Sequence, residues 1–275
     1  MDTAKDLSAP PNGLAEDEAL LLSAVEAAGD LALGFFKRGL KGMHKADNSP
    51  VSEADLAVDR LLHERLIGER PHYGWLSEET ADDPRRLDAT RVWIVDPIDG
   101  TRAFLAEQPE WTIAAALVER GDPMLAAVFN PVTGQMFTAR RGRGAHLNGA
   151  AMAVRERARI DDSRFMVTRG FFNDKIWRKP WPRVERLWVN SIAYRLALIA
   201  SGEADATLSI TGKSEWDLAA AALLVQEAGG KATDAAGSAL RFNQPVTRIA
   251  GIVAASPALH ALLIEHTRPA MAKQA

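Results

Sequence analysis

The chain has 275 residues, a net charge of −3 and no cysteine. Its length suits one large domain or two closely packed halves, and its near-neutral charge argues against binding a nucleic acid polymer through bulk charge. Since the sequence contains no cysteine, disulfide bonds and thiolate metal sites are excluded, and any metal ion would bind to oxygen or imidazole.

Residues 1–13 are polar and include Pro10 and Pro11, so we expect them to form a disordered tail. They lack the apolar run of a signal peptide. No stretch approaches the roughly 20 apolar residues that a membrane span needs. We therefore expect a cytoplasmic protein without membrane contact.

The first half of the chain is expected to place two helices on a mainly antiparallel sheet. Residues 14–36 and residues 53–69 have helical periodicity, and Ser52 is placed to cap the second segment. The second helix is expected to turn three leucines inward: Leu56, Leu62 and Leu66. Strand-like runs follow at residues 73–76, 91–95, 112–118, 124–129 and 135–139. We treat residues 14–152 as an N-terminal α+β half that carries most of the candidate metal ligands.

The second half alternates strands with helices, which predicts another α/β layer. Its expected strands are residues 165–168, 186–189, 206–210 and 249–254, and its expected helices are residues 191–201, 216–228 and 257–266. Gly229 and Gly230 are a common C-terminal stop for the middle helix. We treat residues 153–275 as a C-terminal α/β half that carries Asp217 and the substrate contacts.

The most informative segment is the string Trp-Ile-Val-Asp-Pro-Ile-Asp-Gly-Thr at residues 93–101. Pro97 is expected to turn the chain at the end of a strand, where it would hold Asp96 and Asp99 on a rigid tip. Gly100 permits close backbone approach, and Thr101 can open a helical turn whose N–H groups favour an anion. Taken alone, the Asp-Pro and Asp-Gly pairs more often mark an ordinary turn. The whole string favours a phosphatase that uses Mg²⁺, an ion that prefers oxygen ligands.

Two more acidic segments extend this pattern. Glu78 follows the short strand at residues 73–76, and its alternative reading is a solvated loop. Asp217 stands three residues after Ser214, a spacing that also suits a helix-capping box. Both roles are compatible for Asp217, because the start of a helix is a rigid place to mount a ligand.

In this order, the motifs resemble the inositol monophosphatase superfamily of Mg²⁺-dependent, lithium-sensitive phosphatases. The resemblance rests on Asp-Pro-Ile-Asp-Gly-Thr at residues 96–101, on the Glu78 pair, and on Trp216-Asp217 before an Ala-rich helix that ends in Glu-Ala-Gly-Gly. Residues 49–55 are similar to the family's stretch ahead of its second helix, and the likeness covers residues 14–255. It implies an α/β fold that alternates helix and sheet layers (αβαβα).

The same resemblance implies two or three Mg²⁺ ions. Their ligands would be Glu78, Asp96, Asp99, Asp217 and the carbonyl of Ile98. One ion would activate a water molecule and another would stabilise the leaving alkoxide. Glu78 and Thr101 would orient that water, and Asp55 would support Thr101 through a hydrogen bond. The N–H groups of Gly100 and Thr101 would hold the phosphate.

Within the superfamily, the chain is closest to the 3′(2′),5′-bisphosphate nucleotidase branch, whose substrate is 3′-phosphoadenosine 5′-phosphate. Ile210 stands where inositol monophosphatases commonly carry a glutamate, whereas Ser214-Glu215-Trp216-Asp217 is similar to the nucleotidase motif. Thr168-Arg169 is the nearest match to that branch's Ser-Arg pair, and Arg195 falls where it carries a lysine. The implied substrate contacts are Gly100, Thr101, Thr168, Arg169, Arg195 and Glu215.

Charge agrees with a substrate that carries a second phosphate, because residues 155–195 hold eleven Lys/Arg against five Asp/Glu. An ordinary solvated basic face explains the same count about equally well. Phe171, Phe172 and Trp177 either line a nucleobase pocket or belong to the core or a dimer contact. Lys45 and Asp47 lie on a loop that in this family can fold over the metal ions, so we treat them as gating residues.

Three functional readings stay open. The favoured one is the bisphosphate nucleotidase, and its alternative is a phosphatase for inositol 1-phosphate or another small monophosphate such as histidinol phosphate. A non-enzymatic or RNA-associated regulator on the same fold would require the loss of a metal ligand, and none is lost. The expected partner is a small phosphorylated metabolite, with a homodimer implied by the resemblance alone.

Overall fold

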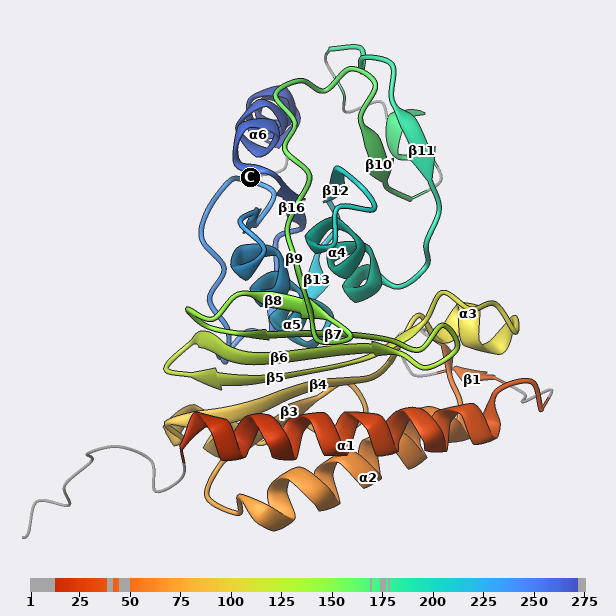
Figure 1. Cartoon of the computed structure of the whole chain (residues 1–275), viewed down its shortest axis with the longest axis vertical. Coiled ribbons are helices and arrows are strands. Elements are labelled where there is room, and N and C mark those ends of the chain that lie inside the picture. Colours follow the sequence, from red (N-terminus) through yellow and green to blue (C-terminus); the bar gives the residue numbers. More distant parts are fainter. Residues whose placement is uncertain are drawn as a thin grey trace, which may run out of the picture.

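The computed structural model describes residues 13–38, 42–44, 50–168, 170–173, 177 and 179–271. The expectations for the first twelve residues, for Lys45 and Asp47, and for Arg169 lie outside these residues. Across the described part of the chain, helices and sheets alternate as αβαβα (Figure 1). Two long helices form the lowest layer in Figure 1, and the C-terminal helix forms the uppermost one.

The lowest layer consists of α1 (Leu14–Phe35) and α2 (Glu53–Glu69), close to the predicted ranges. Helix α2 begins with the predicted cap at Ser52, whose backbone N–H and hydroxyl both donate to Asp55. Leu62 and Leu66 are buried as expected, but Leu56 is 40% exposed. The expectation for Leu56 was wrong because Leu62 and Leu66, four residues apart, define the inner face of the helix and Leu56 lies off that face.

The next layer is a seven-stranded sheet in the order β3-β4-β5-β6-β7-β8-β9. Its strands are β3 (Gly74–Ser77), β4 (Arg91–Asp99), β5 (Thr112–Glu119), β6 (Asp122–Asn130), β7 (Gln135–Arg140), β8 (Ala145–Leu147) and β9 (Ala150–Met152). Only the β3–β4 pair is parallel among them, so the prediction of a mainly antiparallel sheet is confirmed.

Strand β4 is longer than predicted and changes the account of the acidic motif. It runs on through Pro97 to Asp99, and its pairing with β5 shifts register between Asp96 and Asp99. Proline lacks the N–H that a regular ladder needs, and such an irregularity accommodates it. The chain therefore turns at Gly100, not at Pro97, and α3 (Thr101–Leu105) follows at once.

The middle layer holds α4 (Ile192–Ala200) and α5 (Glu215–Glu227), which lie between the two larger sheets (Figure 1). Every residue of α4 is buried, and so is every residue of α5 from Leu218 to Val225. Helices that are apolar all round need covering on both sides. Both helices belong to one core cluster with residues of both sheets, including Val128 and Ala254.

The fourth layer is a five-stranded sheet in the order β11-β10-β12-β16-β14. Its strands are β10 (Arg164–Met166), β11 (Glu185–Leu187), β12 (Ala206–Ser209), β14 (Lys231–Thr233) and β16 (Ile252–Ala255). Along β16 the side chains alternate, so that Ala254 packs in the core with α4 and α5 while Val253 packs with Leu259 and Leu263 of α6 (Pro257–Met271). Helix α6 is therefore the uppermost layer.

Shorter elements complete the described chain. Two small ribbons pair β1 (Met43–His44) with β2 (Pro50–Val51) and β13 (Lys213–Ser214) with β15 (Arg248–Ile249). Two 3₁₀ turns are η1 (Pro84–Asp88) and η2 (Phe171–Asn173). The strand expected at residues 249–254 is divided into β15 and β16 at Gly251, which has φ of 78°.

The two larger sheets are separate along the sequence, since one uses residues 74–152 and the other residues 164–255. The division into halves at residues 152 and 153 stays a prediction. Within the part of the chain that the structure describes, each helix is too short or too polar to cross a lipid bilayer.

Candidate active site

Three aspartates from two elements converge between the seven-stranded sheet and α5. Asp96 and Asp99 come from the end of β4 and Asp217 from the first turn of α5. Each offers one carboxylate oxygen, and these three atoms lie within 4.8 Å of one another. Asp96 is only 1% exposed, and its Oδ1 atom accepts no hydrogen bond from the described residues. Such an arrangement of buried like charges calls for a cation.

The electrostatics of these carboxylates point the same way. Burial, reinforced by Asp217, raises the pKa of Asp99 to about 7. Burial is also the main cause that raises the pKa of Asp217 to about 6. The pKa of Asp96 is raised well above its usual value by burial first and then by the charges of Glu78 and Asp99. In the absence of a cation, the site therefore retains protons near neutral pH.

Neighbouring helix starts hold two of these aspartates in place. Asp99 Oδ2 accepts hydrogen bonds from the Ser191 hydroxyl and from the Ala193 N–H, both at the beginning of α4. Asp217 Oδ2 accepts the N–H of Ser214 at 2.7 Å, which completes the predicted capping box of α5. Each carboxylate is therefore anchored through one oxygen by a rigid element.

Glu78 follows β3 and is near enough to the three aspartates for its charge to raise their pKa values. Among the described residues, the group of carboxylate oxygens within 4.8 Å of one another contains the three aspartates and not Glu78. The residues on either side of the Glu78-Glu79 pair are fixed by one buried side chain of α2. The Ser77 hydroxyl donates to Asp59 Oδ1 at 2.5 Å, and the Thr80 hydroxyl donates to Asp59 Oδ2 at 2.6 Å. Asp59 was not predicted from the sequence, although it stands four residues after Asp55 and so on the same helix face.

The segment after Asp99 has the geometry expected from its sequence. Gly100 adopts φ of 99°, and a Cβ atom there would lie 3.0 Å from the Glu110 carbonyl oxygen. Only glycine fits such a site without strain. The Thr101 hydroxyl lies 3.1 Å from Asp55 Oδ1 and 3.1 Å from the Ile98 carbonyl oxygen, so the expected contact between Asp55 and Thr101 is present.

A cavity of about 320 Å³ adjoins this segment. It is lined by Gln108, Glu110, Val167, Thr168, Trp188, Val189, Asn190 and Arg195. Thr168 and Arg195 were predicted substrate contacts, and the structure brings both to one cavity. Burial lowers the pKa of Arg195, and the nearby charge of Asp99 opposes that change. The Arg195 Nε atom donates to the Val189 carbonyl at 2.6 Å.

Glu110 is the cavity residue that sequence reasoning missed. Its Oε2 atom is buried and has no hydrogen-bond partner among the described residues. The only sequence signal was its position shortly after the Asp-Gly-Thr motif. Glu110 lies in none of the predicted helices or strands. Glu110 and Arg195 are 85 residues apart in sequence and come to line one cavity only in the folded chain.

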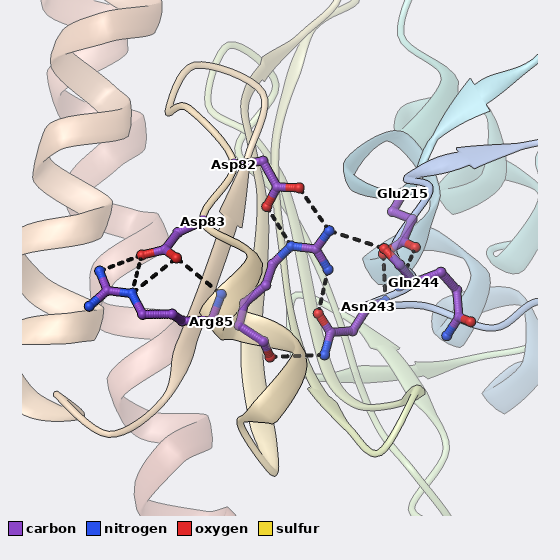
Figure 2. Close-up of polar contacts among 7 residues, drawn as sticks. Asp82, Asp83, Arg85, Glu215, Asn243 and Gln244 are labelled. Carbon is purple, nitrogen blue, oxygen red and sulfur yellow. Dashed lines mark hydrogen bonds and ion pairs between the residues drawn. The ribbon is translucent and has the colours of Figure 1, made fainter.

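The structure corrects the expectation that Glu215 contacts substrate. Glu215 is fully buried, and both carboxylate oxygens are already bonded. Its Oε1 accepts the N–H of Gln244 at 2.8 Å and its Oε2 the N–H of Asn243 at 2.5 Å (Figure 2). These contacts direct the side chain toward the loop after β14 instead of the cavity.

Five aromatic residues of the basic segment at residues 155–195 belong to the core cluster that includes Leu259 and Leu263 of α6. Phe171 lies 4.9 Å from Trp177 and 5.5 Å from Trp181 between ring centroids. Phe172 packs against the same cluster, together with Phe165. None of these five rings lines the cavity at Arg195, which favours the core reading over a nucleobase pocket.

Comparison with known proteins agrees with this geometry. The family described as "Inositol monophosphatase family" matches residues 14–272. The inositol-1-monophosphatase of Rhizobium meliloti (strain 1021) is 35% identical over 195 residues, which cover 68% of this chain and 73% of that protein. The histidinol-phosphatase of Chlorobaculum parvum (strain DSM 263 / NCIMB 8327) is 32% identical over 90% of this chain and 95% of its own. The crystal structure of the extragenic suppressor protein suhB from Bartonella henselae superposes with a TM-score of 0.80 at 27% identity, covering 90% of this chain and 96% of that one.

Proposed function

The chain belongs to the inositol monophosphatase family and is a phosphatase, and we propose that it hydrolyses small phosphate monoesters with two or three bound Mg²⁺ ions. The convergence of Asp96, Asp99 and Asp217 carries this proposal, together with a buried Asp96 oxygen that accepts no hydrogen bond from the described part of the chain. Carboxylate oxygens in this number suit a hard divalent cation.

The residues that would hold the ions are the three aspartates, Glu78 and the Ile98 carbonyl. Bound Mg²⁺ supplies a more acidic water and neutralises negative charge on the phosphate. Asp55 accepts a hydrogen bond from the Thr101 hydroxyl, which leaves lone pairs of the Thr101 oxygen free to accept a hydrogen bond from the attacking water. Glu78 would share the orientation of that water. The N–H groups of Gly100 and Thr101, at the start of α3, would bind the phosphate oxygens.

For the leaving group, we favour a 3′,5′-bisphosphate nucleotide such as 3′-phosphoadenosine 5′-phosphate. Support comes from Arg195 and Thr168, which line one cavity, where a guanidinium can face a second phosphate. Trp188, which is 45% exposed, offers a ring at the cavity wall on which a base can stack. Arg169 stays a predicted contact.

Glu110 supports the alternative. Glu110 lines the same cavity, and its Oε2 atom has no hydrogen-bond partner among the residues that the structure describes. This carboxylate would repel a phosphate, but it would accept a hydrogen bond from a hydroxyl or an ammonium group. Inositol 1-phosphate and histidinol phosphate carry such donors. Two relatives are named as phosphatases for compounds of this kind.

Phosphate release across these three substrates tests the proposal, with Mg²⁺ alone and with added Li⁺. The bisphosphate should be preferred, Arg195→Gln should reduce that preference, and Glu110→Gln should leave it intact. If inositol 1-phosphate or histidinol phosphate is preferred and Glu110→Gln removes the preference, the alternative is correct. A wild-type protein with no Mg²⁺-dependent release from any substrate would contradict the metal-dependent reaction itself.

The regulator reading has less support, because the sequence keeps all four carboxylates of the resemblance and Asp96, Asp99 and Asp217 form one acidic group. A cytoplasmic location and a homodimer stay predictions from the sequence.

A further inference from the structure

A buried arginine connects the loop that carries Glu78 to a distant part of the chain. The side chain of Arg86, in η1, is 1% exposed. On one side, its Nε and Nη2 atoms form a two-pronged contact with Asp82, at 2.6 and 3.0 Å. On the other side, Nη1 donates to Asn243 Oδ1 at 2.6 Å and Nη2 to the Gln244 carbonyl at 3.0 Å. Asp82 lies on the same loop as Glu78, between β3 and η1.

Glu215 binds the same two loop residues from the opposite side. The successive N–H groups of Asn243 and Gln244 donate to its two carboxylate oxygens (Figure 2). Asn243 has φ of 56°, a conformation that asparagine tolerates better than most residues. Its side-chain amide also returns a hydrogen bond to the Arg86 carbonyl at 3.2 Å. Residues 243–244 are therefore held between two buried side chains of opposite charge.

This chain of contacts connects the two sources of metal ligands. Glu215 is the first residue of α5, and Asp217 follows in the same helical turn. Asp82 and Glu78 share the loop after β3 in the seven-stranded sheet. The contacts therefore join the loop that carries Glu78 to the helix start that carries Asp217. We call the set Asp82, Arg86, Asn243, Gln244 and Glu215 the tether.

Stability alone does not explain a tether of this composition. Buried charges lose hydration, and apolar side chains of similar volume often stabilise a protein as well or better. What charge-assisted and two-pronged hydrogen bonds add is a fixed geometry. A site in which four carboxylates must accept small ions at short distances depends on that geometry.

We propose that Arg86 and Glu215 are positioning residues that set the placement of Asp217 relative to Glu78 and so determine the affinity of the site for Mg²⁺. This inference rests on the proposed metal-dependent function and adds residues to it that touch neither metal nor substrate. Glu215 then acts through α5, which accounts for its buried place beside a site residue.

The test measures Mg²⁺ binding directly by isothermal titration calorimetry on the metal-stripped full chain. We expect Arg86→Gln and Glu215→Gln each to weaken binding by about 10–100-fold, as for residues that support metal ligands. At saturating Mg²⁺, kcat and the KM for the phosphate ester should return close to wild-type values. Arg86→Lys keeps the charge without the planar fork and should recover only part of the affinity. The double variant should be little weaker than the weaker single one, since both changes release the same tether.

Arg85→Gln is the matched control. Arg85 is the neighbouring residue of η1, but its side chain is exposed and pairs only with Asp83 among the contacts drawn in Figure 2. It should leave Mg²⁺ binding unchanged. Thermal melts of each metal-stripped variant establish that it is folded before titration. Glu215→Gln keeps one acceptor oxygen, so we expect it to disturb folding least.

Three results would contradict the proposed role of the tether. One is wild-type Mg²⁺ affinity in folded Arg86→Gln and Glu215→Gln. Another is an effect on KM for the ester alone, and the third is an equal loss of affinity in Arg85→Gln. A wild-type chain that binds no Mg²⁺ would instead contradict the proposed function, so the two failures are distinguishable.

Discussion

Asp96 combines nearly complete burial with an oxygen that has no hydrogen-bond partner among the described residues. Replacing Asp96 with asparagine removes a negative charge that the charges of Glu78 and Asp99 repel. We expect Asp96→Asn to stabilise the metal-free protein by about 0.5–2 kcal/mol, the usual range for a single stabilising substitution. Mg²⁺-dependent phosphate release should fall by at least about 100-fold, beyond the usual cost of changing a residue that merely supports a ligand.

Urea unfolding in EDTA measures the first effect, and phosphate release measures the second. Opposite signs in the two measurements separate a functional carboxylate from a structural one. An Asp96→Asn protein that keeps full Mg²⁺-dependent activity would show that the site is wrongly assigned.

The raised pKa values of Asp96, Asp99 and Asp217 predict a pH dependence for the metal-free protein. When an acid has a higher pKa in the folded state than in the unfolded state, the folded state binds more protons, and stability falls as pH rises. The fall should occupy the interval from about pH 4, the unfolded value, to about pH 7, the value for Asp99. Asp55 and Glu215, whose pKa values burial also raises, act in the same direction.

The measurement is the melting temperature in EDTA across this interval, for wild type and for the double variant Asp96→Asn with Asp99→Asn. The difference in melting temperature between the two proteins removes the contributions of His260 and His266. Their lowered pKa values make stability rise with pH. Saturating Mg²⁺ should reverse the wild-type trend, because it replaces the protons. A difference that does not change with pH would refute the assignment of these shifts.

At the scale of elements, α2 supports two separate parts of the site from one face. Asp55 contacts Thr101, and Asp59, one turn later, bonds both Ser77 and Thr80 around the Glu78-Glu79 pair. We expect Asp59→Asn to weaken Mg²⁺ binding by about tenfold, since an amide can accept a hydrogen bond through only one of its two terminal atoms. The fold should persist, because Asn keeps the size of Asp.

Calorimetric titration with Mg²⁺ checks this, with Glu64→Gln on the exposed side of α2 as the control. Ser77→Ala combined with Asp59→Asn should add little to the single change, because both release one contact. If Glu64→Gln weakens binding as much as Asp59→Asn, the support that we assign to Asp59 is refuted.

The elements themselves were largely predictable from the sequence, since period and capping residues are local. Ser52 and Ser214 indicated the starts of α2 and α5, and both capping boxes are present. The register shift in β4 was not predictable, because it depends on pairing with β5. The same reason explains the error for Glu215, whose partners Asn243 and Gln244 are remote in sequence.

At the scale of the whole molecule, a buried polar network fastens the outer helices to the large sheet. Asp17 of α1 accepts hydrogen bonds from Arg70 Nε at 2.7 Å, Tyr73 Oη at 2.8 Å and Arg91 Nη1 at 2.8 Å. Arg91 also bonds Glu119 of β5. Asp17→Ala removes the buried carboxylate that Arg70 and Arg91 both bind. We therefore expect the free energy of unfolding to fall by about 3–5 kcal/mol.

Chemical unfolding measures this loss, with Glu16→Ala as the matched control. Glu16 is mostly exposed and lies 3.9 Å from Arg70, so its removal should cost less than about 1 kcal/mol. Activity per folded molecule should be unchanged in both variants at low temperature. An equal loss of stability in the two variants would mean that burial of Asp17 is not the cause.

The layered architecture followed from resemblance to a family, whereas periodicity alone indicated only helices on a sheet and a second α/β layer. The carboxylates of the site were identifiable because their motifs are continuous in sequence. The supports at Asp55 and Ser214 were also predicted, but Ser191 and Arg86 were not, since Ser191 meets Asp99 and Arg86 meets Asn243 only across layers. Neither pairing leaves a local signature.

The two capping boxes have a use beyond this protein, in design. In each, the aspartate that reaches back to the helix start is also a site residue: Asp55 bonds Thr101, and Asp217 joins the acidic cluster. A Ser-x-x-Asp start therefore fixes a carboxylate with a helix's own backbone and leaves the other oxygen to face a guest ion. Grafted onto two converging helices of an idealised scaffold, it would provide preorganised carboxylates without a dedicated supporting layer.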